Sequence, residues 1–183
     1  MRDGLFSWRT GALHQRAWSV AAQGAAPFVA LALLVRAAKL ARQTGRVQER
    51  LSERFGTYST SRPRGRLVWI HAVSVGEGAA AAPLVEALCA AHPELNVLVS
   101  AGSAAALEAR FASLVWASCN LVLAPLDTTA AARSFLAHWQ PWAAIFVETE
   151  LWPNLLEEAR CANVPVALVN ARASLQRPGQ DIF

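Results

Sequence analysis

Short apolar runs alternate with helix-like segments along the chain from residue 67 onward. The apolar runs predict five strands, at 67–73, 96–100, 119–123, 142–147 and 165–169. Segments of helical character lie between them, at 79–91, 103–112, 128–139 and 153–162. A repeated strand–helix order requires a parallel sheet with right-handed crossovers, and continuously apolar strands are typical of a sheet that helices cover on both faces. The pattern therefore predicts an α/β fold with a Rossmann-like parallel sheet.

An uncharged apolar segment, residues 17–35, precedes this region and lies between Arg16 and Arg36. It has about the length that a helix needs to cross the hydrocarbon core of a membrane. A polar residue, a glycine and a proline interrupt it, so a helix that lies in the membrane interface is an open alternative. The basic residues that follow predict that the downstream domain stays on the cytosolic or matrix side. An organellar presequence, favoured by the acid-free stretch 4–48, and a soluble N-terminal helix also remain open.

Charge divides the chain near residue 66. Residues 1–66 hold twelve of the 17 basic residues and three of the 13 acidic ones, for a net charge of +9, whereas the remainder carries −5. A basic arm of this kind could meet nucleic acid, an anionic membrane surface or an acidic substrate. A stretch punctuated by Pro and Gly ends this basic region, at residues 55–65. We therefore predict an arm at 1–55, a linker at 56–66, a folded domain at 67–175 and a tail at 176–183.

The composition and motifs exclude several classes of protein. With 54% apolar and 16% charged residues, the chain belongs with globular or membrane-associated proteins and not with disordered ones. Its three cysteines form no C-x-x-C pair, which argues against a metal centre or a disulfide framework. No G-x-G-x-x-G, P-loop or G-x-S-x-G motif is present, which disfavours dinucleotide enzymes, P-loop nucleotide enzymes and serine hydrolases. We expect neither a metal nor a cofactor.

Polar residues gather at the ends of the predicted strands. The carboxyl ends of parallel strands meet at one edge of the sheet, where open α/β proteins bind their ligands. We therefore expect one crevice to receive the following residues: Ser74 and Glu77; Ser100, Gly102 and Ser103; Asp127; Glu148 and Glu150; Asn170 and Arg172.

Glu77 is the most conspicuous of these residues. It lies between Gly76 and Gly78, on backbone that can approach a ligand closely, and near a helix N-terminus whose dipole stabilises an ionised carboxylate. An ionised carboxylate in such a place is a candidate general base for a substrate hydroxyl. The alternative is a first-turn glutamate that helps to cap the helix.

A second acidic cluster, E-T-E-L-W-P-N, follows the fourth predicted strand. Glu148 and Glu150 are two residues apart, so an extended backbone would place both carboxylates on one side and raise the pKa of one of them. Trp152 could cover a sugar face or wedge the next helix against the sheet. Arg172 could pair with one of these acids or hold a phosphate.

Other notable residues have structural interpretations. His71 lies inside the first strand and is expected to be a core histidine. Asp127 or Thr128 is predicted to cap the helix at 128–139. Three tryptophans occupy strand or helix positions that core packing explains: Trp69, Trp139 and Trp142.

Three strand-end segments together carry a family resemblance. They are W-I-H-A-V-S-V-G-E (69–77), E-T-E-L-W-P-N-L (148–155) and N-A-R-A-S (170–174), accompanied by A-P-L-D-T (124–128). In order and spacing they resemble the N-terminal domain of the 3-deoxy-D-manno-octulosonic acid (Kdo) transferases, over about residues 48–175. The alanine-rich composition and the A-P-L-D-T segment resemble plant or algal members of that family.

The resemblance implies the N-terminal half of a two-domain, GT-B type glycosyltransferase, preceded by a membrane-associated helix. It implies a lipid A precursor as the acceptor, CMP-Kdo as the donor in a C-terminal domain that this chain would lack, and no metal for the transfer. By the same resemblance, Glu77 is the general base of an inverting transfer, and Glu148 and Glu150 position the acceptor or support the loop that carries the base. We predict that the other strand-end residues complete the substrate-binding set: Ser74, Gly76, Gly102, Ser103, Asn170 and Arg172.

The expected partners are the lipid acceptor and a membrane surface, and not nucleic acid. The expected location is the cytosolic face of a bacterial inner membrane, or a mitochondrion for a plant or algal protein. Two alternatives stay open. One is a non-catalytic, membrane-bound lipid-binding module derived from this family, and the other is a GT-B transferase with a different lipid acceptor.

Overall fold

The computed structural model describes residues 20–22, 24–25, 28, 32, 48–104, 106–107, 119–148 and 152–171. Strands and helices alternate in the order that the apolar pattern predicts. The elements are η1 (Gln48–Phe55), β1 (Leu67–His71), α2 (Val75–Ala91), β2 (Asn96–Ala101), β3 (Cys119–Leu123), α4 (Thr129–Trp139), β4 (Ala143–Val147), α5 (Pro153–Cys161) and β5 (Val166–Val169). Of the helix expected at 103–112, residues 103, 104, 106 and 107 are described, the last three as helical.

The five strands form one sheet in the order β3-β2-β1-β4-β5, and every neighbouring pair is parallel. From β1 the chain proceeds outward to β2 and β3, and it then returns to the other side of β1 to add β4 and β5. The order of the strands therefore reverses between β1 and β4. This is the strand order of Rossmann-like sheets, and the predicted α/β class is confirmed.

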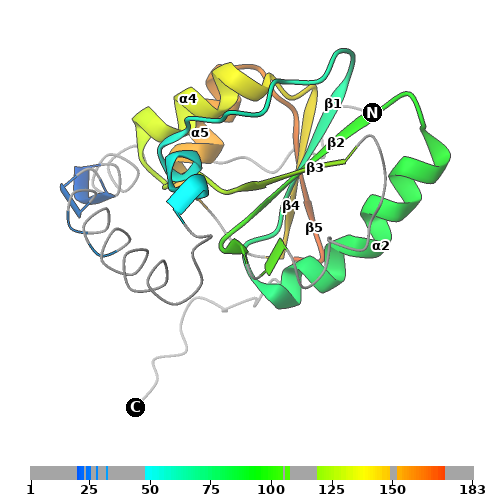
Figure 1. Cartoon of the computed structure of the whole chain (residues 1–183), viewed down its shortest axis with the longest axis horizontal. Helices are drawn as coiled ribbons and strands as arrows, with labels where there is room; N and C mark the ends of the chain where they lie inside the picture. The colour runs from blue at the N-terminus through cyan, green and yellow to red at the C-terminus, as the bar shows by residue number, and fades with distance from the viewer. Residues whose placement is uncertain are drawn as a thin grey trace, which may run out of the picture.

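Helices cover both faces of the sheet, as Figure 1 shows with α4 and α5 on one side and α2 on the other. Neighbouring residues of β1 serve the two cores in turn, because successive side chains of a strand point to opposite faces. Trp69 packs with Phe135 of α4 and Phe146 of β4, and Ile70 belongs to the core that contains Val85 of α2. All five of these side chains are at most 1% exposed, and burial of each contributes roughly 1.5–3 kcal/mol.

The first helix of the folded region begins earlier than predicted. The expected start was residue 79, whereas α2 begins at Val75, so that Gly76, Glu77 and Gly78 form its first turn. Ser74 is the N-cap, and its Oγ accepts a hydrogen bond from the backbone N–H of Glu77 at 3.1 Å. This cap offsets the low helix propensity of the two glycines, which is why the propensity-based boundary was wrong.

The expected core position of Trp142 is also wrong. Its side chain is 54% exposed, and the guanidinium carbon of Arg66 lies 5.0 Å from the ring centroid. Trp142 precedes β4 by one residue, so its ring lies outside the sheet that buries its neighbours, in a cation–π contact. Trp69 and Trp139 are fully buried, as expected.

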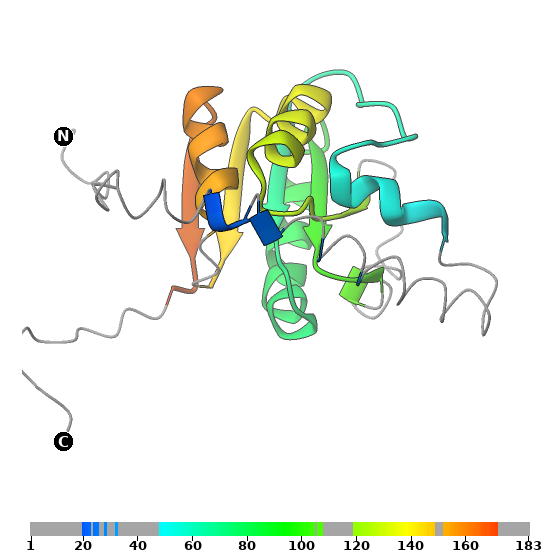
Figure 2. The same ribbon diagram turned by 90° about the vertical axis from the view of Figure 1, so that its left-hand side faces the viewer.

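Residues 48–66 lie against the sheet and α4. η1 runs beside the edge strand β3, on the side of the sheet away from β5 (Figure 2). Arg50 donates to the Leu121 carbonyl and Glu53 accepts from the Leu123 N–H, so side chains of η1 satisfy backbone groups on the outer edge of β3. Tyr58, within the predicted linker, is 9% exposed and packs on Phe135 and Trp139. The division of the chain at 56–66 stays a prediction.

The predicted membrane segment 17–35 lies mostly outside the described residues. Val20, Ala21, Ala22, Gly24, Ala25, Phe28 and Ala32 are described, each as helical. Across the portion of the chain that the structure covers, no helix combines the length and apolar character that a membrane span requires. The predicted tail, 176–183, also lies outside the described residues.

Candidate functional site

The reversal of strand order between β1 and β4 marks the candidate site. In open α/β sheets, ligands bind outside the carboxyl ends of the strands at such a switch point. β1 and β4 run in register from Val68 beside Ala143 to His71 beside Phe146, so the segments that follow them start next to each other. The first of these segments leads to Glu77, and the second begins at Glu148.

Glu77 is held by the segment that leads into its own helix. Its carboxylate Oε2 accepts a hydrogen bond from the Val73 N–H at 2.7 Å, and the residue is 4% exposed. Together with the Ser74 cap, this contact resembles a capping box, so the capping interpretation describes the free protein. A carboxylate has a second oxygen and further lone pairs. Proton abstraction therefore requires the substrate hydroxyl to reach Oε1, or the side chain to turn outward.

Glu148 lies at the end of β4 in a left-handed backbone conformation, with φ of 64°. For a residue other than glycine this conformation costs of order 1 kcal/mol or more, and such residues cluster at functional sites. Two contacts with the β5 side support it. Its N–H donates to the Val169 carbonyl at 2.8 Å, and its carboxylate accepts from the Asn170 side-chain amide at 3.5 Å. The structure thus brings together two residues of the predicted substrate-binding set.

The remaining predicted site residues fall into two groups. Ser74 lies in the turn after β1 and Gly76 in the first turn of α2, whereas Gly102 and Ser103 follow β2, where Ser103 Oγ accepts from the Ala106 N–H at 3.1 Å. A Cβ on Gly76 would meet only Ser74 Oγ, at 3.8 Å, whereas a Cβ on Gly102 would lie 2.6 Å from the Val73 carbonyl oxygen. Close packing of the two turns therefore requires glycine at position 102. Glu150 and Arg172 lie outside the described residues.

A buried polar network beneath the site was not foreseen from the sequence. Ser100 Oγ accepts from Trp69 Nε1 at 2.7 Å and lies 2.8 Å from His71 Nδ1. The hydroxyl keeps a second lone pair and its own proton, so it can accept from or donate to Nδ1, according to the tautomer of His71. Among the described residues His71 Nε2 has no hydrogen-bond partner. Burial lowers the pKa of His71 to about 3, and the charge of Arg54 adds to this shift, so the ring is neutral.

His71 also links this network to the segment after β4. Its ring meets the ring of Trp152 edge to face, with centroids 5.1 Å apart. Trp152 is half-buried and packs against the core beneath α4 and α5, as expected for the wedge, one of the two roles that the sequence leaves open. The core position expected for His71 is confirmed, because the residue is 1% exposed.

Asp127 has a role that spacing did not indicate. Thr128 is the N-cap of α4, and its Oγ1 accepts from the Ala131 N–H at 3.3 Å. Asp127 instead accepts from the Leu155 N–H at 2.9 Å, in the first turn of α5. The N-cap residue of α5 is Trp152, which makes no side-chain cap hydrogen bond, so Asp127 supplies this cap from a distant part of the chain.

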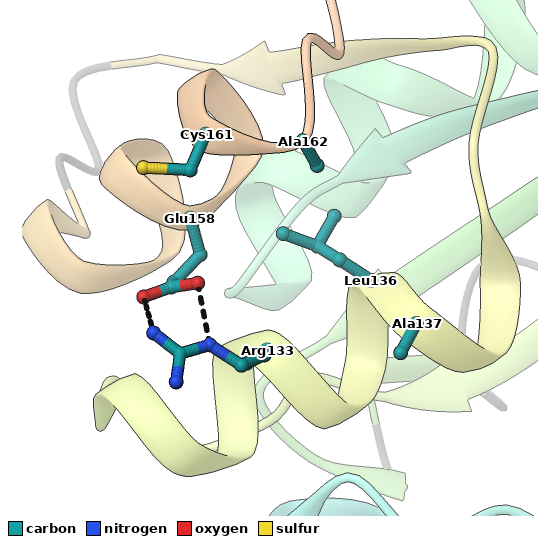
Figure 3. A pocket seen from close by; sticks show the side chains of 6 residues that line it. All are labelled: Arg133, Leu136, Ala137, Glu158, Cys161 and Ala162. Atoms are coloured by element: carbon teal, nitrogen blue, oxygen red, sulfur yellow. Dashed lines mark hydrogen bonds and ion pairs between the residues drawn. The ribbon is translucent and has the colours of Figure 1, made fainter.

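A surface pocket of about 270 Å³ lies elsewhere, between α4 and α5 (Figure 3). Arg133 and Glu158 stand at its rim, joined by two hydrogen bonds of 3.1 and 2.9 Å, and Cys161 lies at the far end of α5. It contains none of the predicted site residues. Within residues 48–104, 106–107, 119–148 and 152–171, no three His, Cys, Asp or Glu side chains gather closely enough to hold a metal ion.

Comparison with known proteins identifies the family. Residues 49–179 match the sequence profile of the family described as "3-Deoxy-D-manno-octulosonic-acid transferase (kdotransferase)". The chain belongs to this family. The matched region contains all the segments that carry the resemblance seen in the sequence, and the predicted family assignment is confirmed.

Individual members of the kdotransferase family show the same relationship. The chain is 42% identical over 125 residues to a probable mitochondrial Kdo transferase of Arabidopsis thaliana, an alignment that covers 68% of this chain and 28% of the relative. It is 37% identical over 130 residues to a Kdo transferase of Haemophilus influenzae, covering 70% of this chain and 30% of the relative. A Bordetella pertussis Kdo transferase is 37% identical over 161 residues, with 86% and 37% covered. The chain thus spans about a third of the length of these relatives.

Proposed function

We propose that this chain is the acceptor-binding part of a glycosyltransferase that transfers Kdo from CMP-Kdo to a lipid A precursor. The observation that carries the proposal is the position of Glu77 and Glu148, which follow the two strands at the switch point of a kdotransferase-family domain. The relatives are named Kdo transferases, and most of their length lies outside the part that this chain matches. We place CMP-Kdo binding in that other part, which gives the whole enzyme a two-domain GT-B architecture.

In the proposed reaction, Glu77 removes the proton from an acceptor sugar hydroxyl. The oxygen then attacks the anomeric carbon of Kdo, the bond from that carbon to the CMP phosphate breaks, and CMP leaves with the bonding electron pair. A single displacement of this kind inverts the configuration at the anomeric carbon. The hydrogen bond from Val73 holds the carboxylate in one orientation, and general-base help of this kind contributes typically 10²–10⁴-fold in rate.

The other site residues would bind the acceptor around this base. Glu148 and Asn170 present polar groups at the ends of β4 and β5, and we assign Glu150 and Arg172 to the same role from the sequence. Ser74 and Gly76 would contribute from the start of α2, and Gly102 and Ser103 from the turn after β2. We also propose that residues 17–35 attach the protein to a membrane, facing the cytosol of a bacterium or the interior of a mitochondrion.

A domain exchange tests this function. Residues 49–179 replace the matching segment of the Bordetella pertussis relative, and the purified chimera receives CMP-Kdo and a tetraacyl lipid A precursor. Mass spectrometry is expected to show product heavier by Kdo, as for the unmodified relative. A folded chimera that binds the lipid precursor without transferring Kdo would favour the non-catalytic binding module. A folded chimera that neither binds nor transfers would contradict the proposal.

A further inference from the structure

An unbroken series of contacts connects η1 to the carboxylate of Glu77. Arg54 of η1 donates to the carbonyl oxygens of Gly102 and, at 2.9 Å, Ala124. The Gly102 N–H donates to the Val73 carbonyl at 2.8 Å. The Val73 N–H in turn donates to Glu77 Oε2 at 2.7 Å. The backbone of Val73 is therefore held on one side by the turn after β2 and on the other by the proposed base.

Close packing makes the middle of this series stiff. An added Cβ on Gly102 would lie 2.6 Å from the Val73 carbonyl oxygen and 2.8 Å from its Cγ1, so the two backbones already touch. The Ala72 N–H donates to the Ser100 carbonyl at 3.0 Å, which ties the same two turns one step earlier. A shift of Gly102 must therefore displace Val73, and with it the hydrogen bond that orients Glu77.

Arg50 provides an internal comparison. It lies on η1 one turn before Arg54, forms an ion pair with Glu53 at 2.9 Å, and donates to the Leu121 carbonyl in β3. Both arginines attach η1 to the sheet, but only Arg54 reaches the turn that contacts Val73. Loss of Arg50 should thus loosen η1 without disturbing the Glu77 hydrogen bond directly.

We propose that Arg54 is a positioning residue for Glu77, acting through Gly102 and Val73. The inference rests on the proposed function for its catalytic meaning, since Glu77 is the base only in that reaction. Arg54 is not itself one of the proposed substrate-binding residues. Its hydrogen bond to the Gly102 carbonyl fixes the position of the turn after β2. The hydrogen bond from Gly102 to Val73 then fixes the position of the segment that leads into α2.

Amide hydrogen exchange in the 183-residue chain tests the link without any activity assay. In Arg54→Gln, protection of the Val73 and Gly102 amides is expected to fall at least tenfold relative to Ile70 in the middle of β1. Arg50→Gln is expected to leave that ratio within twofold of the wild type. Arg54→Lys keeps one charged donor and is expected to restore part of the lost protection. An unchanged ratio in Arg54→Gln, or an equal loss in Arg50→Gln, would overturn the proposal.

Two further measurements keep the test decisive. If Arg54→Gln does not fold, Arg54→Lys alone decides, because a selective loss of protection at Val73 and Gly102 supports the link and a uniform loss contradicts it.

In the chimera, Arg54→Gln should lower kcat through Glu77 and, because Arg54 also holds the acceptor-binding Gly102, raise the KM for the lipid acceptor, whereas Arg50→Gln should change neither. If Arg54→Gln shows the selective loss of protection while Glu77→Gln transfers Kdo at the full rate, that result would reject Glu77 as the base but would support the link from Arg54 to Val73. If Glu77→Gln transfers Kdo slowly but Arg54→Gln shows no selective loss of protection, only the link from Arg54 to Val73 would be rejected.

Discussion

Replacing Glu77 with glutamine is expected to lower the kcat of the chimera by 10²–10⁴-fold, with the KM for the lipid acceptor changed by no more than a few-fold. Glutamine keeps a side-chain oxygen that can accept the Val73 hydrogen bond, so the segment before α2 should hold its position. It cannot take up a proton from the acceptor hydroxyl. The measurement is initial-rate kinetics with CMP-Kdo saturating and the lipid acceptor varied.

Two comparisons separate chemistry from folding in this experiment. Glu86→Gln alters an exposed carboxylate on the same helix and should retain the full rate. The urea midpoint of Glu77→Gln should stay near that of the parent, because the capping contact survives. A Glu77→Gln rate within tenfold of the parent would show that another group accepts the proton.

Acidification is expected to destabilise the protein through His71. The native ring is buried with a pKa of about 3, whereas an unfolded histidine has a pKa of roughly 6.5. Below about pH 6.5 the unfolded state binds a proton that the native state does not, so the free energy of unfolding falls as the pH falls. The fall approaches roughly 1.4 kcal/mol per pH unit and ends near pH 3, where the native ring also becomes protonated. Between pH 7 and pH 5 His71 alone should cost about 2 kcal/mol.

Urea denaturation at pH 7 and pH 5 measures this contribution. His71→Asn keeps a side-chain amide that can accept from or donate to Ser100 Oγ, but it removes the titrating group. It should lose most of the difference in unfolding free energy between the two pH values, whatever its stability at pH 7. His92→Asn, at the exposed end of α2, should keep that difference. If His71→Asn shows the same pH dependence as the wild type, the buried neutral ring is not its source.

The sheet could be predicted from the sequence because burial on both faces leaves an unusually clear signal. Continuous apolar runs such as L-V-W-I-H require helices on both sides, and the resulting strand positions agree with the structure to within two residues. The start of α2, which was predicted from local helix propensity, was placed less accurately than the strands. The two glycines around Glu77 suggested a flexible turn, yet the Ser74 cap draws both of them into α2.

The contacts that organise the site join residues far apart in the chain, and no periodicity reveals such pairs. Arg54 meets Gly102 across 48 positions, and Asp127 caps a helix 28 positions later. From their local sequence, Arg54 is expected to be an ordinary surface residue and Asp127 an ordinary helix cap. The strand-end residues could be selected in advance because parallel topology gathers carboxyl ends at one edge. Their partners could not be selected, since these depend on how the turns pack in three dimensions.

The proposed function requires the acceptor to bind at the carboxyl ends of β1 and β4. Titration of the ¹⁵N-labelled 183-residue chain with the deacylated, phosphorylated disaccharide of the lipid A precursor tests this directly. The largest amide shift changes are expected over Val73–Gly78 and at Glu148 and Asn170. Changes that instead concentrate around Arg133 and Cys161, in the pocket between α4 and α5, would contradict the account.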